Sequence, residues 1–157
     1  MNHLRTATNT GLLALVLALG ACSSQPMQTT AGETATSLNV ALSSSLFAQN
    51  EVPPVMSTAS GTVEAYLNKR TNLLSWTVNY AGLSGAVTAA HFHGPAVAGQ
   101  NAGVVVPMTG SLVNPIVGSA TITAAQLPDL MAGKWYVNLH TAVSPGGEIR
   151  GQVIVKP

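Results

Sequence analysis

The sequence predicts an all-β domain, either an antiparallel β-sandwich or a Greek-key barrel, with one short helix. Three observations predict this class. From residue 39 onward Val, Thr, Ala, Gly and Pro are frequent while Lys and Glu are scarce. Apolar and polar residues alternate with the period of two that strands require. Clusters of Asn, Ser, Pro and Gly, which form turns, separate the alternating stretches.

A leader precedes this domain. "MNHLRTATNTGLLALVLALGAC" has a basic start, an apolar run over 12–19 and small residues before Cys22. The pattern predicts a secretory signal peptide over residues 1–21, too short for a spanning helix. Its ending "LGAC" resembles a bacterial lipobox, which implies cleavage before Cys22 and a lipid on its sulfur. The alternative is an ordinary signal peptide. Cys22 is the only cysteine, so no intrachain disulfide can form.

Residues 22–37 are mainly Ser, Gln, Thr, Ala, Gly and Glu, and they predict a flexible tether from the lipidated cysteine. The domain then covers residues 38–157. Without residues 1–21 the chain keeps five basic residues, five acidic residues and three histidines. Such a neutral chain lacks the basic patch that nucleic-acid binding needs, so we expect no nucleic-acid partner.

The alternating stretches define the strands. "LLSWTVNY" at 73–80 has its apolar residues on one face, and the turn signal "NKRTN" pairs it with "SGTVEAYLN" at 60–68 as a hairpin. "KWYVNLH" at 134–140 and "EIRGQVIV" at 148–155 are predicted strands joined by the turn "SPGGE". In the first of these strands, the apolar residues Trp135, Val137 and Leu139 lie on one face.

The helical signal is "TAAQLPDLMAG". Thr123 and Gln126 form a predicted capping box, and Gly133 ends the helix. Pro128 lies too deep for one helix from Thr123, so we expect a restart with Pro128 in the first turn.

The three histidines of the domain occupy polar strand faces. In "AAHFHG", His91 and His93 share one face and Phe92, a natural core residue, takes the other. His140 likewise faces away from the apolar side of its strand. Three neutral imidazoles are a suitable site for copper or zinc. Hydrogen-bonded structural histidines are the alternative, which the pattern leaves open.

Five other side chains are considered with this site. Thioether sulfur suits Cu(I), so Met56 and Met108 are candidate additional ligands, although packing is the plainer role for a methionine. Asn138 shares its strand face with His140 and is placed to hold a ligand ring. Glu148 and Arg150 share one face of the last strand and are assigned to the surroundings of the site, with pairing across the sheet as their structural role. We identify no catalytic residue.

Three stretches resemble the CHRD domain, a family named after chordin and widespread in bacterial exported proteins. They are "NEVPPVMSTASGTVEAYLN", "GLSGAVTAAHFHGPAVAGQNAGVVV" and "LMAGKWYVNLHTAVSPGGEIRGQV". The resemblance covers nearly the whole domain. It implies an immunoglobulin-like or barrel-like β fold and, because the activity of the family is poorly defined, no particular reaction.

A second resemblance concerns four residues. Copper–zinc superoxide dismutases also carry H-x-H on a strand, then a histidine before a glycine-rich loop, then an arginine before the last strand. His91, His93, His140 and Arg150 follow that order. The fourth copper histidine, the zinc-ligand loop and the disulfide of those enzymes have no counterpart. The resemblance therefore implies a three-histidine copper site, with zinc less favoured, and does not support dismutase activity.

These observations predict a lipid-anchored protein of the bacterial cell envelope that binds copper and buffers, carries or senses it. Ser23 stands where an aspartate typically retains bacterial lipoproteins in the inner membrane. The expected location is therefore periplasm-facing or the outer membrane, with the outer membrane favoured in a diderm bacterium. One alternative is an interaction module without metal that binds another envelope protein. Another is a redox enzyme with an open copper position.

Overall fold

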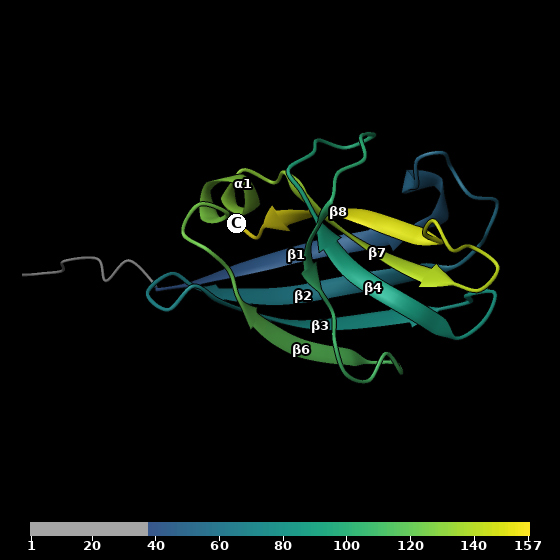
Figure 1. Ribbon diagram of the computed structural model, residues 1–157, viewed down its shortest axis with the longest axis horizontal. Coiled ribbons are helices and arrows are strands. Elements are labelled where there is room, and N and C mark those ends of the chain that lie inside the picture. Colours follow the sequence, from purple (N-terminus) through teal and green to yellow (C-terminus); the bar gives the residue numbers. More distant parts are fainter. Residues whose placement is uncertain (1–37) are drawn as a thin grey trace, which may run out of the picture. The chain divides into compact units, whose positions relative to one another are not determined.

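The domain is built from antiparallel strands, as the sequence predicts. A computed structural model describes residues 38–157, so the expectations for the signal peptide, Cys22 and the tether lie outside the described residues. Eight strands form one sheet in the order β5-β4-β7-β8-β1-β2-β3-β6, which curls into a nearly closed barrel (Figure 1). The strands are β1 (Asn39–Phe47), β2 (Ser60–Asn68), β3 (Leu73–Ala81), β4 (Val87–His93), β5 (Val104–Pro107), β6 (Ile116–Thr121), β7 (Trp135–Thr141) and β8 (Ile149–Val155).

The β2–β3 hairpin confirms the first predicted pairing. Asn68 Oδ1 accepts hydrogen bonds from the backbone N–H groups of Arg70 and Thr71, at 3.0 and 3.1 Å. Asn72 closes the turn with φ at +55°, a left-handed conformation that asparagine tolerates. The predicted turn residues therefore set the register in which Leu67 faces Leu74.

The predicted helix is present and short. Thr123 and Gln126 exchange hydrogen bonds, with Gln126 Oε1 accepting from the Thr123 N–H at 2.8 Å and Thr123 Oγ1 accepting from the Gln126 N–H at 3.3 Å. The helix α1 (Leu127–Met131) then starts with Pro128 in its first turn, and Gly133 follows it with φ at +71°. The capping turn at Thr123–Gln126 and the helix α1 are therefore two successive elements, as the position of Pro128 predicted. No helix within residues 38–157 is long and apolar enough to cross a membrane.

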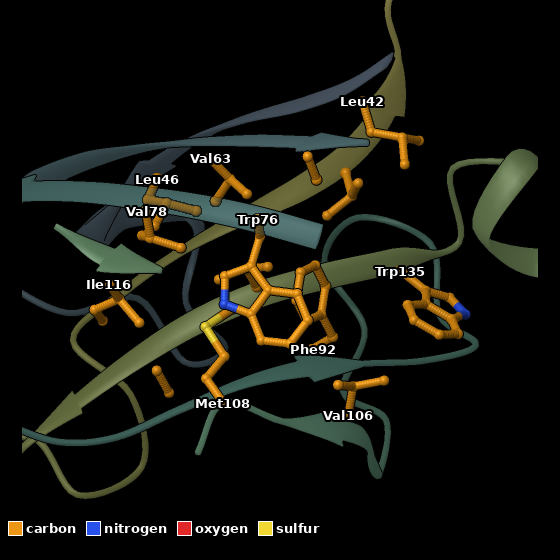
Figure 2. Packing of buried hydrophobic residues seen from close by; sticks show 14 of the residues in the cluster. Leu42, Leu46, Val63, Trp76, Val78, Phe92, Val106, Met108, Ile116 and Trp135 are labelled. Atoms are coloured by element: carbon orange, nitrogen blue, oxygen red, sulfur yellow. The ribbon is translucent and has the colours of Figure 1, made fainter. Parts of the chain in front are cut away.

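Apolar residues from both halves of the sheet meet inside the barrel (Figure 2). Phe92 lies at the centre, with its ring centroid 5.2 Å from that of Trp76 and 6.2 Å from that of Trp135. Phe92 is fully buried, which confirms it as the core residue of "AAHFHG". The alternation of β4 therefore turns the side chains of His91 and His93 away from the core.

Strand β7 is buried on both faces. All seven of its residues are buried. Trp135 and alternate residues face the core, while Tyr136, Asn138 and His140 face the loops that cover the other side of the sheet. Alternation predicted the polar face correctly. It did not predict that loops would bury that face, because burial by loops leaves no periodic signal.

Candidate metal centre

Two neighbouring strands bring the three histidines together. β4 pairs with β7 so that His91 faces Asn138, His93 faces Tyr136 and Ala89 faces His140. Side chains of paired residues point to the same side of a sheet, and so do those two residues further along a strand. The three imidazoles therefore converge, and one ligand atom from each lies within 4.8 Å of the others. The expectation that the histidines share one face is thus confirmed.

His93 is held firmly. Its side chain is 9% exposed, and its Nδ1 lies 3.0 Å from the carbonyl oxygen of Ala102. The ring stacks on Tyr136 with centroids 4.8 Å apart and planes 2° from parallel. Because a carbonyl only accepts, Nδ1 carries the hydrogen and Nε2 keeps a lone pair. That Nε2 is buried and has no hydrogen-bond partner among residues 38–157.

His140 is held in the same way. Its Nδ1 lies 3.0 Å from the carbonyl oxygen of Pro145, so Nδ1 donates and the neutral ring keeps its lone pair on Nε2. This Nε2 lies 3.0 Å from Oδ1 of Asn138 and 3.1 Å from Nδ1 of His91. Asn138 therefore contacts the candidate ligand, as its strand position predicted.

The electrostatics keep two of the imidazoles neutral. Burial lowers the pKa of His91, and repulsion from His140 and His93 lowers it further. Burial also lowers the pKa of His93, against the opposing effect of the Ala102 carbonyl. Metal ions bind the neutral imidazole, so these shifts leave the lone pairs available at neutral pH.

The donor set fits a cation. Nε2 of His140 and Oδ1 of Asn138 are two acceptors 3.0 Å apart, and His91 Nδ1 donates to that Nε2. Nε2 of His93 is a third acceptor, buried and without a partner among residues 38–157. Nitrogens bound to one metal at about 2.0 Å stand roughly 3.3–3.5 Å apart. The 3.1 Å pair is close to that spacing. A separation near the 4.8 Å limit would have to close by about 1.3–1.5 Å when a metal binds.

Tyr136 and Arg150 form a stack behind His93. The guanidinium carbon of Arg150 lies 3.4 Å from the centroid of the Tyr136 ring, and the other face of that ring carries His93. Arg150 is 2% exposed and donates to Oδ1 of Asn101 at 2.8 Å and to the carbonyl of Gln100. Arg150 thus supports His93 through Tyr136, and its charge also lowers the pKa of His93. Sequence reasoning missed Tyr136 because a tyrosine on a strand carries no metal-site signal.

Glu51 is a second residue that the sequence did not assign to the site. Its carboxyl group is 5% exposed and lies beside Asn138 and Gly147. Burial raises the pKa of Glu51 to about 7, although Arg150, the Val52 N–H and Asn138 oppose the shift. A polar path thus runs from Glu51 through the Asn138 amide to His140.

Glu148 occupies a different place. Its carboxylate accepts hydrogen bonds from Ser57, Ser84 and Thr141, at 3.0, 2.5 and 2.7 Å for the hydroxyl groups. Although burial opposes ionisation, these bonds lower the pKa of Glu148. None of its partners is a candidate ligand, so Glu148 fixes loops rather than histidines.

Neither methionine lies at the cluster. Met108 is buried in the core beside Trp76, on the side of β4 opposite to the histidines (Figure 2). Met56 is fully exposed to solvent in the loop after η1 (Ala48–Asn50). The structure thus gives Met108 a packing role and exposes Met56 to solvent.

The fold and the cluster define a class: a small antiparallel β-barrel domain that carries three histidines on two adjacent strands. The family model of the CHRD domain matches residues 42–153, and the chain belongs to this family. No curated protein and no solved structure matches the chain significantly. The similarity to superoxide dismutases consequently rests on the order of four residues alone.

Proposed function

We propose that this protein is a lipid-anchored protein of the bacterial cell envelope that binds one copper ion through His91, His93 and His140, and that buffers, transfers or senses the metal. The observation that carries the proposal is the buried Nε2 of His93, which has no hydrogen-bond partner among residues 38–157 and belongs to a cluster whose ligand atoms lie within 4.8 Å of one another. A buried polar atom without a partner is costly, and a bound cation supplies the missing partner.

The donor chemistry favours copper over zinc. Within residues 38–157 the cluster contains neither a carboxylate nor a thiolate ligand. Structural zinc sites have four protein ligands, whereas this cluster offers three imidazoles. A monovalent Cu(I) ion carries less charge into a site that also lies near the Arg150 guanidinium. The anchor and the envelope position are supported by the leader sequence and Cys22.

A metal titration tests the copper site. The protein is the chain from residue 22 onward with Cys22→Ser, which removes a competing thiol. We expect one Cu(I) per chain, weaker Zn(II) binding, and loss of stoichiometric binding in His93→Ala and His140→Ala. Met56→Ala is the control and binds as the parent does. Copper at a hundred times its Kd stabilises the fold by about 2.7 kcal/mol, a second readout.

The metal-free interaction module is the competing function, and one contact favours it. His91 Nδ1 and His140 Nε2 form a hydrogen bond that ties β4 to β7 without any metal. If Cu(I) binds no better than it does to an exposed pair of histidines, this role stands and the search moves to partners in the envelope. Turnover of superoxide or peroxide by the copper-loaded chain would instead favour the redox enzyme.

A further inference from the structure

The three candidate ligands are held unequally, and this inference rests on the proposed copper site. We infer that His93 and His140 retain the ion while His91 is the exchange ligand, the one that a copper acceptor displaces. The acceptor is a molecule with neutral soft donors, thioether sulfur or aromatic nitrogen, that approaches from the side of His91.

His93 cannot turn freely. The Ala102 carbonyl holds its Nδ1 at 3.0 Å, and Tyr136 covers its ring face. Tyr136 is itself fixed, because its hydroxyl group bonds to the N–H of Ala102 at 3.2 Å and to the carbonyl of Ala102 at 3.3 Å. Arg150 closes the other face of the tyrosine ring. Rotation of His93 would break several of these contacts together.

His140 is restrained through Nδ1 and by the burial of its strand. Pro145 accepts from Nδ1 at 3.0 Å, and Asn138 lies 3.0 Å from Nε2. The strand that carries it, β7, is buried along its whole length. Its imidazole is 9% exposed, like that of His93. Both rings therefore keep their lone pairs directed at the site before a metal arrives, the preorganisation that outer hydrogen bonds give a ligand.

His91 differs in each of these respects. Its residue is partly exposed, whereas the other two are buried. Its one hydrogen bond in the domain runs from Nδ1 to Nε2 of His140, a partner that the metal would take over. No backbone carbonyl within residues 38–157 orients this ring. Rotation about its side-chain bonds therefore breaks one hydrogen bond, which metal binding already replaces, and the edge contacts of its ring with His93 and His140.

The exchange balances without a redox step. When Cu(I) binds, the neutral His91 ring moves its hydrogen from Nδ1 to Nε2, and the freed Nδ1 lone pair bonds to the metal. On transfer a donor of the acceptor forms a bond to copper and the bond from His91 breaks. Two nitrogens then hold the ion until further acceptor donors remove it, since Cu(I) is stable at low coordination number. The hydrogen returns to Nδ1 once copper has left and Nε2 of His140 can accept it again. Copper stays Cu(I) throughout.

Transfer kinetics test the inference. The chain from residue 22 with Cys22→Ser is loaded with Cu(I) and mixed with excess bicinchoninate, an aromatic nitrogen chelator whose copper complex absorbs visible light. In His91→Ala we expect one Cu(I) per chain, an affinity lowered roughly 10–100-fold and a correspondingly faster transfer. X-ray absorption should show one nitrogen ligand fewer than in the parent. His93→Ala and His140→Ala should not hold copper stoichiometrically.

The outcomes separate the two proposals. If His91→Ala loses copper as completely as His93→Ala, or transfers it at the parental rate, the inference about His91 is wrong while the copper site stands. If the parent itself binds no copper, the proposed function fails. Circular dichroism and thermal unfolding of each variant establish that it is folded. His91→Gln, which keeps a side chain of similar length, should behave as His91→Ala does.

Discussion

At the scale of single residues, Glu51 links the stability of the fold to pH. Its carboxyl is buried beside Asn138, and burial raises its pKa from 4.5 to about 7. Between pH 4.5 and about 7, the folded chain therefore keeps a proton on Glu51 that the unfolded chain has released. Stability is then fully present below pH 4.5 and falls as the pH rises through about 7.

Glu51→Gln tests this linkage. Glutamine keeps the shape and removes the charge, so at pH 8 we expect the variant to be more stable than the parent by about 2–3 kcal/mol. At pH 4.5 the two free energies of unfolding should agree. Urea denaturation at several pH values measures the difference, in which the contributions of the histidines cancel. Parallel profiles for variant and parent would contradict a raised pKa.

Removing the carboxylate of Glu148 should lower stability, in contrast to the removal of the Glu51 charge. Its carboxylate joins Ser57, Ser84 and Thr141, which belong to three separate segments. Glu148→Ala leaves the buried Thr141 hydroxyl and the hydroxyl groups of Ser57 and Ser84 without their shared acceptor, so we expect a loss of about 2–4 kcal/mol of unfolding free energy. Glu64→Ala, at an exposed ion pair, is the control and should change stability by less than about 1 kcal/mol. Equal effects at the two positions would contradict the anchoring role.

At the scale of elements, the β7–β8 turn connects the site to the fold. Gly147 adopts φ +124°, and a Cβ atom there would lie 2.3 Å from Oε1 of Glu51. The same turn presents the Pro145 carbonyl that orients His140. One glycine therefore serves the backbone conformation, the Glu51 contact and the ligand geometry.

Gly147→Ala should lower the unfolding free energy by about 2–4 kcal/mol and weaken Cu(I) binding. The neighbouring Gly146 is a matched control, because a Cβ atom there meets nothing within 4 Å. Gly146→Ala should leave both quantities unchanged. Chemical denaturation and copper competition measure the two effects. A Gly147→Ala protein as stable as the control would show that the turn relaxes freely.

Local signals predicted the elements that depend on local chemistry. The turn after Asn68 and the cap at Thr123 use hydrogen bonds between residues two or three apart, so a sequence window contains both partners. The core position of Phe92 followed from alternation along one strand. The strand order of the sheet did not follow, because pairing of β8 with β1 joins the two ends of the domain.

The candidate metal centre was likewise predictable from the sequence only in part. Alternation placed His91, His93 and His140 on polar faces, and their convergence needed only that β4 and β7 be neighbours. The groups that orient them are backbone carbonyls of Ala102 and Pro145, and any residue type supplies a carbonyl. Their identity therefore leaves no trace in the sequence.

At the scale of the whole molecule, ion pairs between side chains contribute little to stability. The described residues form two side-chain ion pairs, Lys134–Asp129 and Lys156–Glu64, and both are partly exposed. Exposed pairs contribute about 0.2–1 kcal/mol each and are screened by salt. The barrel is held chiefly by its apolar core and its strand hydrogen bonds.

We therefore expect stability to be nearly independent of ionic strength. Raising sodium chloride from about 0.05 to 0.5 M should change the unfolding free energy by less than about 1 kcal/mol. Thermal and urea unfolding at pH 8 measure it, with copper absent. Potassium chloride at the same concentrations controls for effects of the particular cation. A strong salt dependence would mean that the buried Arg150 and Glu51 interact with charges outside the described contacts.

The burial of β7 on both faces also determines how fast its amide hydrogens are replaced by deuterium. Solvent reaches neither side of this strand, and its neighbours β4 and β8 occupy its two edges. Its amides should consequently exchange only when the entire domain opens, so their exchange rates report the global unfolding free energy under native conditions. The amide of His140 is among them. A ligand that binds at the histidines would then be visible as slower isotope exchange in the most protected strand of the protein.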